Sequence, residues 1–411
     1  HLRERMRSLP TPTPRTLALW VGGALLMTLG VALGNQDVVW PALFLVLLPL
    51  LALLTVLVLR PHFTVERTIT PPVVGAGEPA TVHTVARVTR PSPAGTVVAE
   101  DDPGHRLGTP HHARLEASRA GQATGTTYPI RGRHRGRYTL DGFRIRFSDL
   151  LGFWVHTVRL PQPTPFVVTP AVVPLPPARA SAYGATGETP IPQTAISGPD
   201  DAMVREYQPR DDVRRIHWPS TARSGTLMVR REEAAWDPTA WVMLDSRAGV
   251  HDEERGERPT FEWLVSAAAS VGLRLLADGY TVTLVDASGT RHDVAADRPA
   301  ARAEWLDPLV DVQVSAAHDL HEATVRMAQA TSEHLFVALV GLLDRGTADL
   351  LAATTASRQR RLVLVMAPRP AARPAFEDGR AILVDHGWTV HEVSVDADLA
   401  EAWESASGGV A

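Results

Sequence analysis

The chain has 411 residues, enough for two or three domains, and a composition of 45% hydrophobic and 21% charged residues excludes a disordered or fibrous protein. Because it contains no cysteine, disulfides, thiolate metal sites and cysteine nucleophiles are excluded. A formal net charge of −4 gives no electrostatic support to nucleic-acid binding.

Two long uncharged segments within residues 1–61 predict a transmembrane hairpin. They are residues 16–34 and 38–59, and at about 1.5 Å per residue they reach roughly 28 and 33 Å as helices, close to the thickness of a bilayer's hydrocarbon core. Only residues 35–37 join them, so the helices run antiparallel. A cleaved signal peptide has one shorter apolar core and a soluble helix pair carries more charge, so membrane anchoring is favoured.

The basic residues around the hairpin predict its orientation. The link between the helices carries none, whereas both outer flanks are basic: Arg3, Arg5, Arg7 and Arg15 on one side, and Arg60 and Arg67 on the other. Positive charge favours the cytoplasmic side of a membrane. We therefore expect a multi-pass protein of the cell membrane, with both termini and the soluble domains in the cytoplasm.

Residues 62–173 have the pattern of a small β-sandwich. Short segments rich in Val, Thr, Ile, Tyr and Phe alternate in part between apolar and polar positions, and Gly and Pro separate them. The predicted strands are 63–69, 80–88, 126–130, 137–147 and 165–170. His105, His111 and His112 are expected in a loop, where metal binding is disfavoured because no further ligand follows at suitable spacing.

Four arginines alternate just before the fourth predicted strand. If Arg131, Arg133, Arg135 and Arg137 lie in one strand, they share one face of it. A solvated or phosphate-facing edge near the membrane is the simpler interpretation, and a surface for acidic lipid or a partner is the alternative. Residues 174–199, rich in Pro, Gly, Ala and Thr, are expected to be a linker or an extended strap.

The segment 200–235 combines many charges of both signs with apolar anchors. Such a mixture is typical neither of a disordered charge run nor of a nucleic-acid patch, and it favours guanidinium–carboxylate pairs. The candidate binding residues are Arg205, Glu206, Tyr207, Arg210, Asp211, Asp212, Arg214, Arg215, Trp218, Arg223 and Arg230. A short helix is expected from which Val213, Ile216 and Trp218 face inward, followed by a turn at Ser224–Gly225 and a strand over 226–230.

This segment resembles the signature of the DUF58 family. The order R-E-Y-x-P-x-D-D-x-R-x-I-x-W, followed by S-x-A-R-x-G-x-L-x-V-R, is similar to that signature, as are elements within residues 131–153. The resemblance implies a membrane-anchored bacterial protein with a von Willebrand factor A-like domain and a MoxR-type AAA+ ATPase as its partner.

Three roles for the segment stay open at this point. It could be a salt-bridged strap that docks the β domain onto the C-terminal domain, or a surface whose arginines recognise carboxylates of another protein. Catalysis by Asp211, Asp212 and His217 is the third, although nothing in the sequence marks a substrate pocket.

Residues 236–411 alternate between apolar strands and amphipathic helices. Strands are predicted at 240–245, 280–286, 334–341, 361–367 and 389–395, and helices at 261–278, 322–331, 348–357, 376–385 and 399–403. This order predicts a mostly parallel sheet with helices on both faces, a Rossmann-like α/β domain that looks like a von Willebrand factor A-like fold.

That fold often binds a metal through D-x-S-x-S after the first strand. The corresponding residues here are Asp245, Ser246, Arg247, Ala248 and Gly249, with Asp344 at the place of a second acidic residue. Asp245, Ser246 and Asp344 are thus the remnant of a metal site, while Arg247 opposes a cation by charge. We predict no metal there.

Function follows from these features and from what the chain lacks. The sequence contains no phosphate-binding loop, no dinucleotide fingerprint and no hydrolase or zinc-protease motif, so no catalytic residue and no cofactor is predicted. We expect a membrane-tethered, non-enzymatic protein-interaction module that acts with the AAA+ ATPase in assembly or chaperone-like work and binds no nucleic acid. The alternatives are a cell-envelope enzyme that uses residues 203–233 and a purely structural membrane scaffold.

Overall fold

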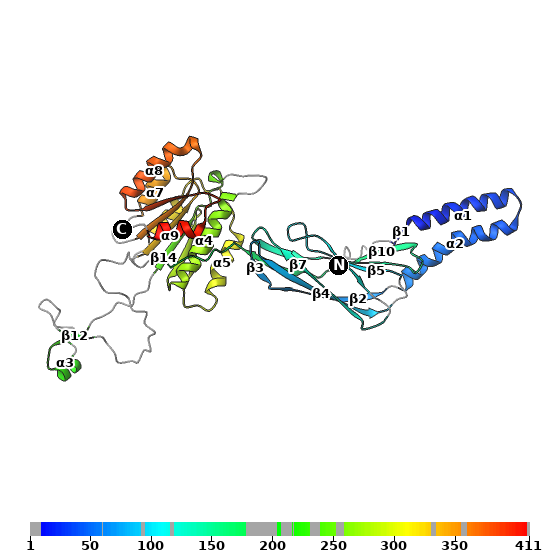
Figure 1. The fold of residues 1–411 in the computed structure, drawn as a ribbon, viewed down its shortest axis with the longest axis horizontal. Coiled ribbons are helices and arrows are strands. Elements are labelled where there is room, and N and C mark those ends of the chain that lie inside the picture. Colours follow the sequence, from blue (N-terminus) through cyan, green and yellow to red (C-terminus); the bar gives the residue numbers. More distant parts are fainter. Residues whose placement is uncertain are drawn as a thin grey trace. The chain divides into compact units, whose positions relative to one another are not determined.

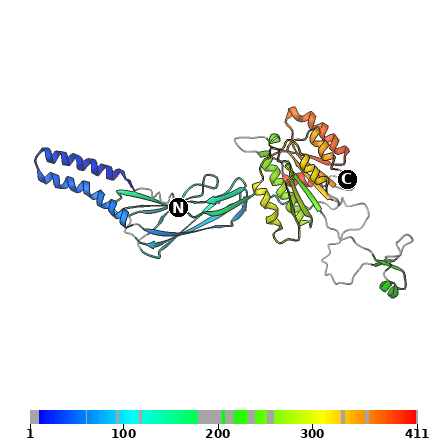
Figure 2. The same ribbon diagram turned by 180° about the vertical axis from the view of Figure 1, so that it is seen from behind.

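The computed structural model describes residues 10–59, 61–91, 95–115, 119–177, 204–206, 216, 218–230, 239–251, 259–329, 334–354 and 360–408. They divide into two compact units (Figures 1 and 2). The first contains residues 1–173 with 265–270 and 303–313, and the second contains 174–264, 271–302 and 314–411. Each unit is described by itself.

The predicted helical hairpin is present at the start of the first unit. It consists of α1 (Pro14–Ala32) and α2 (Gln36–Val58), and the Asn35 side chain caps α2 by accepting a hydrogen bond from the Asp37 amide at 2.9 Å (Figure 1). Glycines let the helices pack closely, because a Cβ atom at Gly23 would lie 2.9 Å from Val46 and one at Gly30 would lie 3.0 Å from Val39.

Three helices in the described part of the chain are long and apolar enough to cross a membrane. They are α1, α2 and α4 (Pro259–Ala277). The structure buries 56% of the apolar window of α4, against 17% and 22% for α1 and α2. The apolar side chains of α4 are thus mostly covered by the protein's own core, whereas most of those of α1 and α2 are not.

A β-rich region follows the hairpin, as predicted, and its strands form three sheets, whereas a simple sandwich has two. The sheet orders are β1-β10-β9-β5-β6, β3-β11-β8 and β2-β4-β7. The prediction missed several short strands. The bounds are β1 (Thr11–Pro12), β2 (His62–Thr70), β3 (Val73–Gly75), β4 (Pro79–Arg90), β5 (Val97–Asp102), β6 (His111–Leu115), β7 (Ala123–Arg131), β8 (Gly136–Leu140), β9 (Gly142–Ser148), β10 (Trp154–Arg159) and β11 (Thr164–Thr169).

The sheet β2-β4-β7 contributes to both apolar clusters of this region. Alternate residues of a strand point to the same face, so Val82, Ala86 and Val88 of β4 are all buried. One cluster joins this face to Phe143, Ile145 and Phe147 of β9 and to the base of the hairpin. The other cluster joins it to β8 and β11. The long strands β2 and β4 therefore hold the two clusters together.

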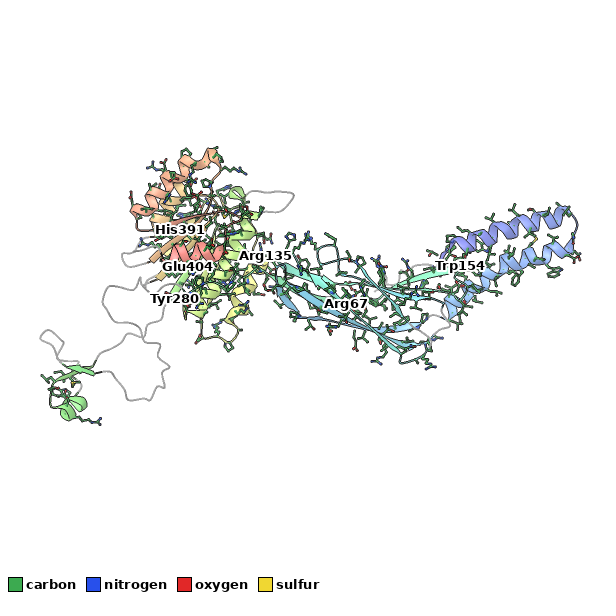
Figure 3. The ribbon with its side chains drawn as sticks, in the orientation of Figure 1. Arg67, Arg135, Trp154, Tyr280, His391 and Glu404 are labelled. Atoms are coloured by element: carbon green, nitrogen blue, oxygen red, sulfur yellow. The ribbon has the colours of Figure 1, made fainter. Side chains whose placement is uncertain are left out.

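A buried ion pair lies inside this apolar region. The guanidinium of Arg67 donates to both carboxylate oxygens of Asp101, at 3.2 and 2.5 Å, and its remaining Nη donates to the carbonyls of Leu140 and Gln162. Thr84 donates to the same carboxylate at 2.9 Å. Both charged side chains are almost inaccessible to water, and Figure 3 shows Arg67 within the β-rich region. A buried pair persists when its hydrogen bonds are satisfied, as they are here.

Two predictions for this region are wrong. The alternating arginines do not share a strand face, because β7 ends at Arg131 and a loop carries Arg133 and Arg135 before β8 begins. Within the first unit, Arg137 of β8 instead pairs with Asp307 and Asp311 of α5 (Ala301–Asp311), at 2.7 and 2.8 Å. His111 and His112 lie in β6 rather than in a loop, because they pair with β5.

The C-terminal α/β domain has the predicted mostly parallel sheet. Its order is β16-β15-β14-β17-β18-β19, in which only the edge strand β16 runs antiparallel. The prediction missed β16 and α5. The remaining elements are β14 (Thr239–Leu244), β15 (Thr281–Asp286), β16 (Arg291–Val294), α6 (His321–Ala328), β17 (His334–Val340), α7 (Arg345–Ala352), β18 (Arg360–Met366), α8 (Arg373–Asp385), β19 (Thr389–Val393) and α9 (Leu399–Gly408).

Both faces of this sheet are buried. Trp241 and Met243 of β14 belong to a cluster with residues of α6, α7 and α8, and the alternate residues Val242 and Leu244 are fully buried as well. Strands of a parallel sheet covered on both faces read as nearly continuous apolar runs. The order of elements and the burial confirm the predicted α/β architecture.

We expect Asp101→Asn to destabilise the first unit by about 3 to 5 kcal/mol, because the Arg67 guanidinium would stay buried without a compensating charge. Chemical denaturation of the detergent-solubilised chain, followed by tryptophan fluorescence, measures this. Glu100→Gln is the matched control, since Glu100 is the neighbour of Asp101 in β5 and pairs only at 3.6 Å with the part-exposed Arg144, so its loss should cost less than about 1 kcal/mol. Equal effects of the two substitutions would contradict the prediction.

Candidate functional site

The carboxyl end of β14 carries the acidic residue predicted at the head of the metal-site remnant. Asp245 directly follows the strand, is fully buried, and its amide donates to the carbonyl of Leu339 at 2.9 Å. Because β14 lies between the parallel strands β15 and β17, the segments that follow all three strands meet at this edge.

The carboxylate of Asp245 is bound by an arginine two residues away. Nε and Nη2 of Arg247 donate to its two oxygens, each at 2.8 Å, in the planar fork that a guanidinium favours. The amides of Arg247 and Gly341 donate to the same oxygens at 3.2 and 3.0 Å. The negative charge is thus neutralised and both oxygens are hydrogen-bonded twice.

The same guanidinium connects three segments of the domain. Besides Asp245 after β14, it donates to the carbonyl of Leu342 after β17 and to the hydroxyl of Thr347 in α7, both at 3.2 Å. The amide of Thr347 in turn donates to Asp344, the N-cap residue of α7, at 2.8 Å. Only about 6% of the Arg247 side chain is exposed to solvent, so the connection is internal.

These charges shift the pKa values of the groups around them. Burial alone would lower the pKa of Arg247, but its hydrogen bond to Asp245 and the negative charges of Asp245, Asp344 and Asp319 raise it above its ordinary value. Burial alone would raise the pKa of Asp344, but hydrogen bonds from Thr347 and the positive charge of Arg247 lower it. Both groups therefore remain charged at neutral pH.

Two further side chains hold the loop after β14. The buried hydroxyl of Ser246 accepts from the amide of Ala287 at 3.2 Å, and the backbones of Ser246 and Ser315 are joined at 2.6 Å. A ring nitrogen of His251 lies 2.8 Å from the carbonyl of Asp245, and the other lies 3.3 Å from Thr260. Gly341 permits this, because a Cβ atom there would lie 2.7 Å from the His251 ring.

This donor set does not suit a divalent cation. A cation beside Asp245 would have to displace a guanidinium that already binds both carboxylate oxygens, and the positive charge of Arg247 would repel it. Among the described residues, no group of three or more His, Asp or Glu side chains has metal-binding geometry. The geometry thus gives a physical reason for the expectation that no metal binds here, which stays a prediction.

The structure describes part of the signature segment. Arg205 and Glu206 lie in β12 (Val204–Glu206), which pairs with β13 (Met228–Arg230), the strand that contains Arg230. Trp218 and Arg223 lie in α3 (Trp218–Ser224). The remaining candidates lie outside the described residues: Tyr207, Arg210, Asp211, Asp212, Arg214 and Arg215. Val213 and His217 lie outside them as well.

The helix in this segment begins later than predicted, while the turn and the strand are confirmed. Ile216 is in a β-bridge position, and α3 starts only at Trp218. Gly225 has a φ of 74°, which makes the predicted turn, and the Met228 amide donates to Thr221 at 2.9 Å, so β13 is joined to α3. The prediction that Trp218 faces inward is wrong, because its side chain is 65% exposed; Leu227 is exposed as well, at 45%.

Sequence reasoning found Asp245, Ser246, Arg247 and Asp344, but it missed the partners that complete the site. Gly341, Thr347 and Ser315 lie far from Asp245 in the sequence, and His251 follows Asp245 after six residues without a motif that marks it. One signal was available for Thr347, because it lies three residues after Asp344 in the arrangement of an N-cap.

A known protein family matches the C-terminal part of the chain. Residues 203–402 match the family described as "Protein of unknown function DUF58". The chain therefore carries a DUF58 domain, which confirms the resemblance seen in the signature segment. No curated protein matches the chain.

Among solved structures, a von Willebrand factor type A protein from Catenulispora acidiphila is similar with a TM-score of 0.30 and 12% identity, over 42% of this chain and 41% of that one. This chain thus spans about two fifths of that structure. The CARDB domain of the PF1109 protein from Pyrococcus furiosus is similar with a TM-score of 0.19 and 15% identity, over 26% of this chain and 93% of that one.

We expect Arg247→Ala to destabilise the α/β domain by about 3 to 5 kcal/mol, because the Asp245 carboxylate would be left buried without its countercharge. The melting temperature of the full chain in detergent measures this. Arg345→Ala, which removes an exposed arginine at the start of α7, should have little effect.

The same measurement with Mg²⁺ tests the site itself. Millimolar Mg²⁺ should leave the melting temperature of the unmodified chain unchanged, since a ligand that binds the folded state raises it. A rise of several degrees would show that Arg247 does not close the site to cations.

Proposed function

We propose that this DUF58 protein is a membrane-tethered, non-enzymatic interaction module. In this proposal α1 and α2 cross the cell membrane, and the β-rich region and the α/β domain lie in the cytoplasm. There the signature segment binds another protein, and a MoxR-type AAA+ ATPase is the partner that the family resemblance favours. A tether raises the local concentration of such a complex at the membrane without any new contact.

The exposed apolar surface of the hairpin supports the tether. Leu25, Val31 and Leu51 are 66%, 69% and 62% exposed, and side chains of this kind are stable in contact with lipid. Arg15 precedes most of α1 and no basic residue lies between the helices, in agreement with cytoplasmic ends. Arg67 does not add to this argument, because it is buried against Asp101.

The exposed tryptophan of α3 is the observation that carries the interaction proposal. Trp218 is 65% exposed, although tryptophan offers the largest apolar area of any side chain. Arg223 in α3 and Leu227, between α3 and β13, are exposed as well. Tryptophan and arginine are the residues that most often dominate protein–protein interfaces. The three exposed residues Trp218, Arg223 and Leu227, called the α3 surface below, have the composition of a protein-binding site.

The Asp245–Arg247 pair supports a non-enzymatic role for the edge of the sheet. Catalysis at such an edge needs a group that can give or take a proton, or a bound cation. Arg247 and Asp245 neutralise each other, and their hydrogen bonds hold the loops in one arrangement. The edge therefore serves better as a rigid support than as a reaction centre.

Binding of the purified chain to a MoxR-type AAA+ ATPase tests the proposal directly. Immobilised detergent-solubilised chain should capture the ATPase, and Trp218→Ala should weaken the complex by at least about 2 kcal/mol, roughly 30-fold in Kd. Val384→Ala is the control, because Val384 is also exposed, at 53%, but lies in α8. Failure of the unmodified chain to capture the ATPase would remove this partner, and equal binding by Trp218→Ala would remove the α3 surface.

A reporter fused after residue 411 tests the orientation. We expect green fluorescent protein to fluoresce there and alkaline phosphatase to be inactive, because the fusion point lies in the cytoplasm. The opposite pattern would place the α/β domain outside and would favour an enzyme acting on the cell envelope.

A further inference from the structure

The loop between β9 and β10 exposes two leucines beside the base of the hairpin. Leu150 is 69% exposed and Leu151 is 50% exposed, whereas Phe153 and Trp154, which follow after Gly152, are buried. Consecutive large apolar side chains that face solvent are unfavourable for a soluble domain and indicate a surface that is covered by something else.

The loop is rigidly held, so the exposure is a property of the fold. The carboxylate of the buried Asp149 accepts from the amide of Leu151 at 2.9 Å and from that of Trp154 at 2.6 Å. The Gly152 amide donates to the Asp149 carbonyl at 3.1 Å, and its φ of 71° closes the turn. Two leucines are thus presented outward by a turn whose polar groups are satisfied internally.

Hydrogen bonds fix this loop to the start of α1. The hydroxyl of Thr16, which is fully buried, donates to the carbonyl of Phe153 at 2.5 Å, and Thr13 donates to Phe153 and Gly152 at 2.8 and 2.9 Å. The turn therefore lies at the level of the first turn of α1. No relative motion along the helix axis is possible without breaking these bonds.

Tryptophan contacts tie the same level to α2. The indole of Trp154 donates to the carbonyl of Pro49 at 2.7 Å, and that of Trp20 donates to the carbonyl of Val46 at 3.3 Å. The two rings meet edge to face at 5.9 Å (Figure 3 labels Trp154 at the base of the hairpin). Indole rings are enriched at the membrane–water interfaces of membrane proteins, where one side is apolar and the other is wet.

The apolar surface of the loop continues into that of the helices. Leu17 of α1 and Leu54 of α2 are 52% and 56% exposed near the same end of the hairpin, and the exposed Arg15 stands beside Gly152. An apolar surface with an arginine at its margin has the chemistry of a bilayer interface, in which acyl chains meet phosphate groups. A protein partner would cover the two leucines but would leave the continuity with the helices unexplained.

We propose that Leu150 and Leu151 insert into the interfacial layer of the bilayer, where Arg15 faces lipid phosphates. The inference rests on the proposed membrane tether. It assigns the β-rich region a third point of contact with the membrane, so that this region is held at a set depth and orientation instead of swinging from the two helices.

Site-directed labelling of the full chain in lipid vesicles tests this, and the absence of native cysteines means that a single introduced cysteine is labelled alone. Leu150→Cys and Leu151→Cys would each carry an environment-sensitive dye, in vesicles of phosphatidylethanolamine and phosphatidylglycerol. We expect blue-shifted emission and strong quenching by lipids that carry a nitroxide near the headgroup. Two positions are used so that a fold defect in one variant does not decide the result, and urea denaturation checks each labelled chain.

Two further positions separate this inference from the tether. Leu25→Cys, in the middle of α1, should be quenched by a nitroxide deep in the acyl chains, and Val73→Cys, 50% exposed in β3, should not be quenched. If Leu25→Cys is quenched and both loop positions are not, the inference is overturned and the tether stands. If Leu25→Cys is not quenched, both the inference and the proposed membrane tether are overturned. A loop label that is blue-shifted but unquenched would overturn the inference in favour of a protein partner.

Discussion

The α/β domain is organised around a buried ion pair between Asp245 and Arg247, at the carboxyl end of its first strand. Removing a carboxylate and a guanidinium from water costs several kcal/mol each, and only complete hydrogen bonding makes the pair tolerable. Asp245 and Arg247 meet that requirement, because Gly341, Leu342 and Thr347 supply the remaining donors and acceptors. The loops after β14 and β17 and the start of α7 must therefore adopt one mutual arrangement for the domain to fold.

A guanidinium beside Asp245 affects the edge of the sheet differently from a bound metal ion. A cation can be gained or lost and leaves coordination positions for a ligand, whereas Arg247 is covalently part of the chain and about 94% covered by its neighbours. The edge of the sheet is then a permanent element of the structure. In the proposed function the sheet is therefore a support, and the α3 surface, with its exposed tryptophan, makes contact with partners.

The first unit uses the same chemistry for a different purpose. Arg67 and Asp101 form a second buried, two-pronged ion pair between the two apolar clusters of the β-rich region. The hydroxyl of Thr84 donates a further hydrogen bond to the Asp101 carboxylate. The planar geometry of arginine suits both pairs, since a lysine offers no comparable fork. The hairpin is also firmly attached to the β-rich region, because hydrogen bonds of Thr13, Thr16 and Trp154 join the two.

Most of the longer helices and strands, and their order, could be predicted from the amino-acid sequence alone. Length and lack of charge predicted α1 and α2, the alternation of strands and helices predicted the parallel sheet, and the pattern around Arg205 and Trp218 indicated the DUF58 domain. These features depend on residues close together in the chain, so that local periodicity is sufficient to recognise them. Short strands such as β5 and β6 were not predicted, because their alternation of apolar and polar residues covers too few positions.

Which side chains contact each other could not be predicted from the sequence and is known only from the tertiary structure. Thr347 lies 100 residues from Arg247, and Thr16 lies 137 residues from Phe153, yet each pair is hydrogen-bonded. The sequence placed Arg247 at the position of a metal ligand, but the direction of its guanidinium depends on the loops that the sheet brings together. The exposure of Leu150 and Leu151 beside the hairpin likewise follows from strand pairing, because burial is a property of the packed chain and not of the residue type.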